Sequence, residues 1–175
     1  MWNTFCRGAP SVVDNLVDIH NEAQRGSRVK ANVMFALKQV CSRPVAPPAS
    51  ASKEAIGPKV MVKLVDELKF AAENANDPVN TTNPEAQLVD HDCVTNAVLL
   101  LEVLSVVRRN CELMVHARLV EALRGIMNSQ LFRPEEVEQD GNVEPLPDST
   151  CEHLQKLWES LDGKYAQPDT PLTLP

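Results

Sequence analysis

Cys111 and His116 have the residue types and the close spacing that could support nucleophilic chemistry. They lie five positions apart, and a cysteine activated by a histidine is a common nucleophile in enzymes. Catalysis would require the two side chains to face each other across a pocket, whereas a free cysteine is usually a buried packing residue. We therefore predict that Cys111 packs in the core, that His116 lies on a helix flank, and that the chain is not an enzyme.

A zinc site is the other chemistry that these residue types suggest. His91 and Cys93 precede a long apolar segment, and Cys111 and His116 follow it. As a helix this segment would span about 25 Å, whereas zinc ligands lie about 2.0–2.3 Å from the metal, so its two ends cannot share one ion. The chain also lacks the GxGxxG, GxxxxGK[ST], GxSxG and HExxH sequences of common nucleotide, hydrolase and metalloprotease sites. We expect neither a metal nor a cofactor.

Composition and charge narrow the classes of partner. The chain has 175 residues, is 43% hydrophobic and 4% aromatic, and carries a formal net charge of −7. Acidic and basic residues balance over residues 1–132, so the excess negative charge belongs to residues 133–175. A neutral body with an acidic tail argues against nucleic acid, which requires concentrated Lys and Arg. Five cysteines without a CxxC pair, no apolar run of about 18 residues and no secretory signal pattern predict a cytoplasmic protein, with the nucleus left open.

The elements that must position these residues are predicted to be helices. Apolar residues recur at spacings of three and four, and strand-like alternation is weak. Caps and helix breakers place the helices at residues 11–24, 27–41, 58–74, 92–109, 112–129 and 150–162. Within these, Pro58 and Asp92 are predicted to start their helices, and Ser149 with Glu152 matches a capping box. Loops are expected at residues 44–52 and 76–84. We predict a helical domain over residues 1–132 and an acidic, partly disordered tail over residues 133–175 that contains the short last helix.

An internal repeat relates the first and third of these helices. Residues 10–18 (PSVVDNLVD) and 58–66 (PKVMVKLVD) share Pro, Val, Leu, Val and Asp at the same offsets. Residues 118–123 (RLVEAL) form a looser third copy. Helical repeats of this kind stack, and each unit covers the apolar side of its neighbour.

The repeat carries a family resemblance. Residues 110–123 (NCELMVHARLVEAL) resemble the junction between the second and third helices of an armadillo repeat, and residues 52–58 (SKEAIGP) resemble the same junction one unit earlier. The resemblance covers residues 8–129, and HEAT-type helix pairs fit nearly as well. Ala117 and Arg118 replace the usual turn-forming residues, so continuous helix is expected there, and the loops are longer than the family norm.

The resemblance implies an all-α, right-handed superhelical stack of about two and a half repeats. Such a stack needs its ends covered. We expect the C-terminal helix with Leu157 and Trp158 to act as a cap. The alternatives are Trp2 and Phe5, a second copy of the chain, or a longer parent protein.

The resemblance also implies a groove lined by the third helix of each unit. Its solvent-facing residues would be Asn15, Asp18, Lys63, Asp66, Glu121 and Arg124. Such a mixed polar surface suits an extended or helical peptide, and an ordinary solvated face is the equal alternative. We expect a non-catalytic protein-binding scaffold or regulatory module. The alternative is a structural subunit of a homo- or hetero-oligomer that assembles through the ends of the stack.

The acidic segment suggests a regulatory contact. We hypothesise that residues 135–148 fold back over basic side chains of the groove and compete with a partner. The basic side chains concerned are Lys59, Lys63, Arg118 and Arg124.

Overall fold

The chain folds into helices throughout the part that the structure describes. The computed structural model describes residues 11–43, 52–75, 84–132 and 145–165, and within these ranges it contains seven helices and no strand. The helices are α1 (Val12–Glu22), α2 (Arg28–Cys41), α3 (Lys53–Ala75), α4 (Pro84–Leu104), α5 (Arg108–His116), α6 (Leu119–Met127) and α7 (Asp148–Tyr165). The predicted all-α class is confirmed. The predicted loops at residues 44–52 and 76–84 and the acidic segment lie almost entirely outside the described residues.

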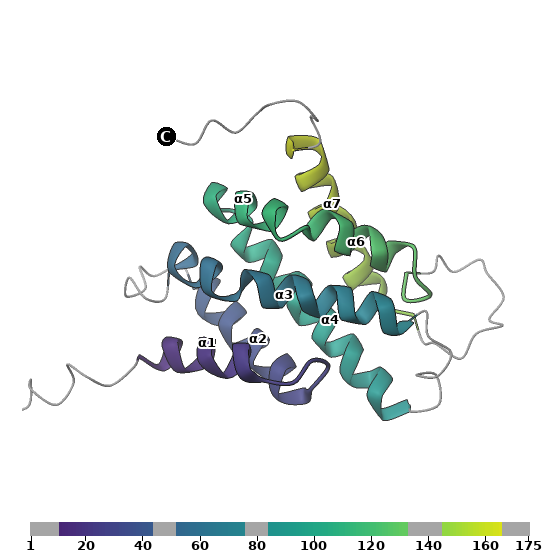
Figure 1. Cartoon of the computed structure of the whole chain (residues 1–175), viewed down its shortest axis with the longest axis horizontal. Helices are drawn as coiled ribbons and strands as arrows, with labels where there is room; N and C mark the ends of the chain where they lie inside the picture. Colours follow the sequence, from purple (N-terminus) through teal and green to yellow (C-terminus); the bar gives the residue numbers. More distant parts are fainter. Residues whose placement is uncertain (1–10, 44–51, 76–83, 133–144, 166–175) are drawn as a thin grey trace, which may run out of the picture.

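The helices form two packed layers (Figure 1). Figure 1 shows α1, α3 and α6 side by side in the first layer, with α5 continuing into α6. The second layer consists of α2, α4 and α7, which lie behind the first layer and pack against it. Within the first layer α3 packs against α1, α5 and α6, and within the second layer α4 packs against α2 and α7. Each first-layer helix therefore has one side toward the second layer, one or two sides toward its neighbours, and one side toward solvent.

One apolar core fills the space between the layers. Its fully buried side chains include Leu37 on α2, Leu64 on α3 and Leu123 on α6. Helix α4 is enclosed on several sides, because α2, α3 and α7 all pack against it. Its completely buried side chains include Val94, Val98, Leu100, Leu101 and Leu104.

The first two helices begin where their capping residues predicted. The Ser11 hydroxyl accepts a hydrogen bond from the Asp14 amide at 3.1 Å and donates one to the Asp14 carboxylate at 2.6 Å. The Ser27 hydroxyl accepts from the Lys30 amide at 3.2 Å. These side chains replace the partners that the first amides of a helix lack, so a local sequence signal is enough to set the start.

Helix α3 corrects one prediction. It begins at Lys53 rather than at Pro58, because Ser52 caps it by accepting a hydrogen bond from the Ala55 amide at 3.2 Å. Pro58 lies inside the helix, so no turn occurs at Gly57 and Pro58, where the armadillo resemblance places a junction between helices. A proline at this position removes one hydrogen bond, to the carbonyl of Glu54, a residue that is itself exposed.

Helix α4 also departs from its predicted limits. It begins at Pro84, so Asp92 is an exposed residue within the helix rather than its cap. It ends at Leu104 rather than near residue 109. Side chains from α5 donate hydrogen bonds to the carbonyls at this end. The Asn110 amide donates to the carbonyl of Leu104 at 3.1 Å, and the Cys111 thiol donates to that of Ser105, one residue past the helix, at 2.9 Å. The predicted helix was too long at this end because its stop depends on these later residues.

The segment predicted as one helix over residues 112–129 is two helices. The helix is interrupted at Ala117 and Arg118, and Arg118 has left-handed backbone angles, with φ 63° and ψ 42°. The expectation of continuous helix at this corner is therefore wrong. The ammonium of Lys69 on α3 donates to the Ala117 carbonyl at 3.4 Å, which supplies a partner for the end of α5.

The last helix closes the second layer. Helix α7 begins at Asp148, one residue before the predicted capping serine, and continues past Gly163 to Tyr165. Its buried residues Leu154, Leu157 and Leu161 lie on the side that packs against α4 and α6. Polar contacts also join it to α4: the hydroxyls of Thr95 and Thr150 lie 3.0 Å apart, and His153 Nδ1 lies 2.8 Å from the Glu102 carboxylate.

Candidate partner-binding face

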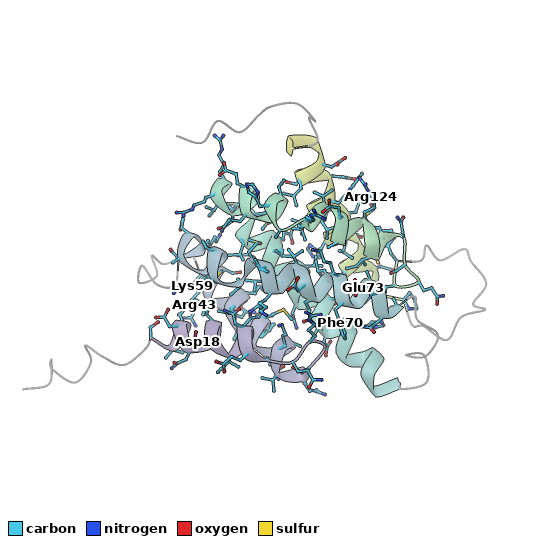
Figure 2. The ribbon with its side chains drawn as sticks, viewed as in Figure 1. Asp18, Arg43, Lys59, Phe70, Glu73 and Arg124 are labelled. Carbon is cyan, nitrogen blue, oxygen red and sulfur yellow. The ribbon has the colours of Figure 1, made fainter. Side chains whose placement is uncertain are left out.

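The solvent side of the first layer carries the six predicted groove residues. Five of them are exposed and Asp66 is half-buried. They lie in pairs on three helices: Asn15 and Asp18 on α1, Lys63 and Asp66 on α3, and Glu121 and Arg124 on α6. We call this side the candidate face. Figure 2 shows that labelled side chains from all three helices, from Asp18 to Arg124, are spread across this view of the molecule.

Helical periodicity explains why these residues reach solvent. On α3 the core residues Val60, Leu64 and Leu68 recur at a spacing of four and face the second layer. Val62 and Asp66 lie between them in sequence and therefore on the other side of the helix. The apolar pattern that builds the core thus also fixes which polar residues form the candidate face.

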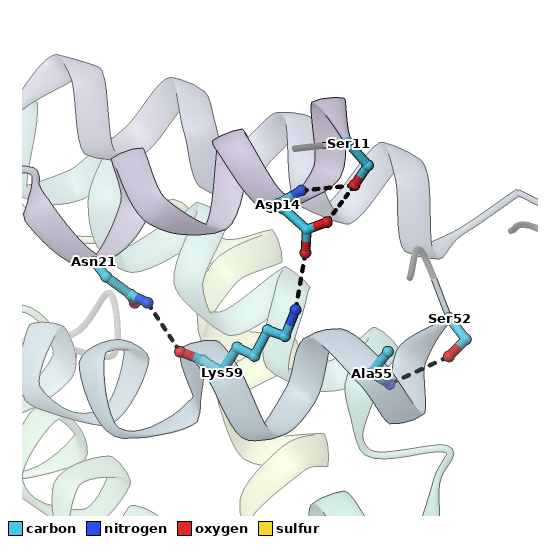
Figure 3. A network of polar contacts seen from close by, with 6 residues as sticks. All are labelled: Ser11, Asp14, Asn21, Ser52, Ala55 and Lys59. Carbon is cyan, nitrogen blue, oxygen red and sulfur yellow. Dashed lines mark hydrogen bonds and ion pairs between the residues drawn. The ribbon is translucent and has the colours of Figure 1, made fainter. Parts of the chain in front are cut away.

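Helix α1 is fixed to α3 by polar contacts at the edge of the candidate face (Figure 3). The Lys59 ammonium lies 2.9 Å from the Asp14 carboxylate, and the Asn21 amide donates to the Lys59 carbonyl at 3.1 Å. The hydrogen bond from Lys59, followed by that from Ser11, lowers the pKa of Asp14. Asp14 is therefore held as a carboxylate, and Lys59, a proposed target of the acidic segment, already has an acidic partner.

Helices α5 and α6 meet α3 at short range on its other side. Gly125 of α6 lies over α3, where a Cβ in place of its hydrogen would be 3.5 Å from the Cβ of Ala72. The Lys69 contact with Ala117 closes the same seam. Helices α1, α3, α5 and α6 therefore form a continuous surface.

The candidate face also contains apolar side chains that the sequence analysis did not select. Val62, on α3 between the two flanking helices, is 62% exposed, and Val115 on α5 is also exposed. Phe70 is half-buried under the Arg25 guanidinium, which lies 5.8 Å from the ring centroid. The signal that could have found Val62 was its departure from the apolar spacing of α3. An exposed valine among charged residues gives a partner both an apolar contact and polar contacts.

A buried polar group lies beneath the candidate face and was also missed. The Lys30 ammonium of α2 lies 3.7 Å from the Glu67 carboxylate of α3, and both side chains are almost completely buried. Glu67 also accepts a hydrogen bond of 2.6 Å from the amide of Gly26, which has a left-handed φ of 64°. Burial lowers the pKa of Lys30, and the Glu67 charge opposes this effect. These contacts hold the α1–α2 connection against α3.

His20 belongs to the same interior. It is fully buried on α1, and its Nδ1 lies 3.1 Å from the Asn21 side-chain oxygen. Burial is the main cause that lowers its pKa to about 4, and the nearby charges of Lys30 and Lys63 act in the same direction. His20 is therefore a neutral structural residue at ordinary pH.

Cys111 and His116, the candidates for nucleophilic chemistry, differ in their exposure to solvent. The Cys111 thiol is buried and donates to the Ser105 carbonyl, whereas His116 is exposed at the end of α5. The Cys93 thiol lies 3.5 Å from the Ser27 carbonyl. Burial raises the pKa of Cys41 to about 11, which keeps that thiol protonated. No group of three potential ligands that could hold a metal ion occurs among the residues that the structure places.

Two further results concern membrane crossing and similarity to known proteins. None of the helices in the described ranges is both long and apolar enough to cross a membrane. Comparisons of the chain with models of protein families, with curated proteins and with solved structures find no match.

Proposed function

We propose that the protein is a non-catalytic scaffold or regulatory module that binds an extended or helical segment of another protein on the candidate face. The observation that carries this proposal is that α1, α3 and α5–α6 are locked edge to edge, so that their outer sides present one mixed polar and apolar surface. The two-layer packing of helices supports an armadillo-like or HEAT-like right-handed stack. In such a stack a surface of this kind is suited to a peptide.

The charges on the candidate face suggest how a partner would lie. The exposed charged residues of α1 are acidic, Asp18 and Glu22, whereas α6 and the turn before it carry exposed Arg118, Glu121 and Arg124, which leaves a net positive charge. A segment that crosses the helices would meet complementary charge if its basic residues lay over α1 and its acidic residues lay over α6. The exposed Val62 between them would contact an apolar residue in the middle of the segment.

Affinity capture followed by mass spectrometry tests this proposal. The bait is the full chain, and the test variant combines Lys63→Glu with Arg124→Glu on the candidate face. The matched control combines Arg28→Glu with Lys156→Glu, which reverses two exposed charges of the second layer. Circular dichroism checks that both variants are folded.

We expect the first pair of substitutions to remove proteins that the wild-type chain captures, and the control pair to retain them. A fluorescent peptide from a captured protein should then bind with an anisotropy change that is lost in the first variant and weakens as salt is raised. Capture of the same proteins by both variants would show that the candidate face is only a solvated surface.

A further inference from the structure

The edge of α1 opposite α3 carries exposed apolar side chains. Val12 is 76% exposed and Ile19 is 44% exposed, and half-buried Leu16 lies between them at helical spacing. Asp14 and Asn21, which bind Lys59 of α3, each lie two positions from one of these residues. Two positions correspond to about 200° around a helix, so the apolar stripe points away from α3.

The neighbouring helix of the second layer continues this side. Ala31 of α2 is buried, and its carbonyl accepts a hydrogen bond from Asn96 of α4 at 3.2 Å. Val29, two positions earlier, is 56% exposed and lies on the opposite side of α2. We call the set of Val12, Leu16, Ile19 and Val29 the apolar end. At the opposite end of the second layer, by contrast, α7 covers α4.

We propose that residues 1–10 of the same chain cover the apolar end, with Trp2 and Phe5 as the contacting side chains. This segment leads directly into Ser11, the cap of α1, so its last residue is two positions before Val12. The stripe from Val12 to Ile19 is about 10 Å long at 1.5 Å per residue. The six residue-to-residue steps from Phe5 to Ser11 can span about 20 Å when extended.

The chemistry of the segment matches this site. Trp2 and Phe5 offer large apolar surfaces, which are stabilised by leaving water. The charged side chain of the segment, Arg7, would lie near an α1 surface whose exposed charges are Asp18 and Glu22. The apolar side chains that carry this inference lie on another side of α1, so it does not depend on the proposed function, although Asp18 belongs to the candidate face as well.

Tryptophan fluorescence of the full chain tests the inference. The chain has two tryptophans, so Trp158→Phe leaves Trp2 as the reporter. Quenching by acrylamide is measured in this background, in the same background with Ile19→Asp, and with Val106→Asp as the matched control. Val106 is 75% exposed in the turn after α4, away from the apolar end. Circular dichroism confirms the fold of each variant, and Val12→Asp serves as a second test substitution.

We expect Trp2 to be quenched several-fold less in the native protein than in urea, and this protection to be lost with Ile19→Asp or Val12→Asp but kept with Val106→Asp. Quenching of native Trp2 equal to that in urea would overturn the inference, as would protection that survives both test substitutions. Protection that disappears on dilution, together with a dimer mass by light scattering, would also overturn it, because a second copy would then be the occupant.

Discussion

Replacement of Gly57 by alanine should destabilise the protein, although alanine is the better helix former. Gly57 lies in α3 against the side chain of Asn110, and a Cβ at Gly57 would approach Asn110 Nδ2 to 2.6 Å. The Asn110 amide is fully buried and joins two helices, since it donates to the carbonyls of Lys53 at 3.0 Å and Leu104 at 3.1 Å. The added methyl group can be accommodated only if this amide moves.

The expected magnitude follows from two opposing effects. Glycine-to-alanine substitution within a helix ordinarily stabilises by about 0.5–1 kcal/mol. Displacing Asn110 weakens two hydrogen bonds of about 1 kcal/mol each and leaves buried groups unpaired at about 1–3 kcal/mol. The loss is larger than the gain, so Gly57→Ala should lower the free energy of unfolding by about 2 kcal/mol.

Urea denaturation followed by circular dichroism measures this change, and the chain provides a matched control. Gly125 lies in α6, where an added Cβ would make an ordinary contact of 3.5 Å with Ala72. Gly125→Ala should therefore raise the urea midpoint, whereas Gly57→Ala should lower it. In an Asn110→Ala background the obstruction is gone, and Gly57→Ala should become stabilising. A raised midpoint for Gly57→Ala in the wild-type background would refute the reasoning.

Three further predictions concern the interior and the caps. The pKa of His20 falls from 6.5 in the unfolded chain to about 4 in the folded one. The free energy of unfolding should therefore be highest above pH 6.5 and should fall by about 3 kcal/mol as the pH is lowered to 4, because the unfolded chain binds the proton more readily. His20→Gln should flatten the pH dependence of the unfolding free energy over that range. Glu67→Ala should cost about 3–5 kcal/mol in urea titrations because it leaves Lys30 and the Gly26 amide buried without their partner, and a cost under 1 kcal/mol would contradict this view. Ser27→Ala should lower the melting temperature through loss of about 1 kcal/mol at the start of α2.

Local signals determined which parts of the fold the sequence could predict. The starts of α1 and α2 follow from the hydroxyls of Ser11 and Ser27, each of which caps an amide three residues later. The start of α3 was misplaced because Gly57 and Pro58 have the local character of a turn. The close approach of Asn110, far away in the sequence, accounts for the glycine. A left-handed arginine at position 118 has no local sequence signal, so the break between α5 and α6 was not predicted.

The same distinction between local and long-range signals applies to the candidate site. The exposure of Asn15, Lys63 and Arg124 could be predicted because the spacing of apolar residues alone determines which side of a helix reaches solvent. The pairing of Lys30 with Glu67 could not, because two charged residues on different helices appear in a sequence as ordinary surface residues. Whether the exposed residues bind a partner remains a prediction for the capture experiment.

The contact between Gly26 and Glu67 has a consequence for how the molecule opens. An amide in a connection between helices ordinarily exchanges its hydrogen with solvent within a short time, because small local fluctuations release it. The Gly26 amide instead donates to the buried carboxylate of Glu67 on α3, at 2.6 Å. Its exchange therefore requires the α1–α2 hairpin to separate from α3, which makes this single proton a reporter of whether the first hairpin detaches alone or only when the whole chain unfolds.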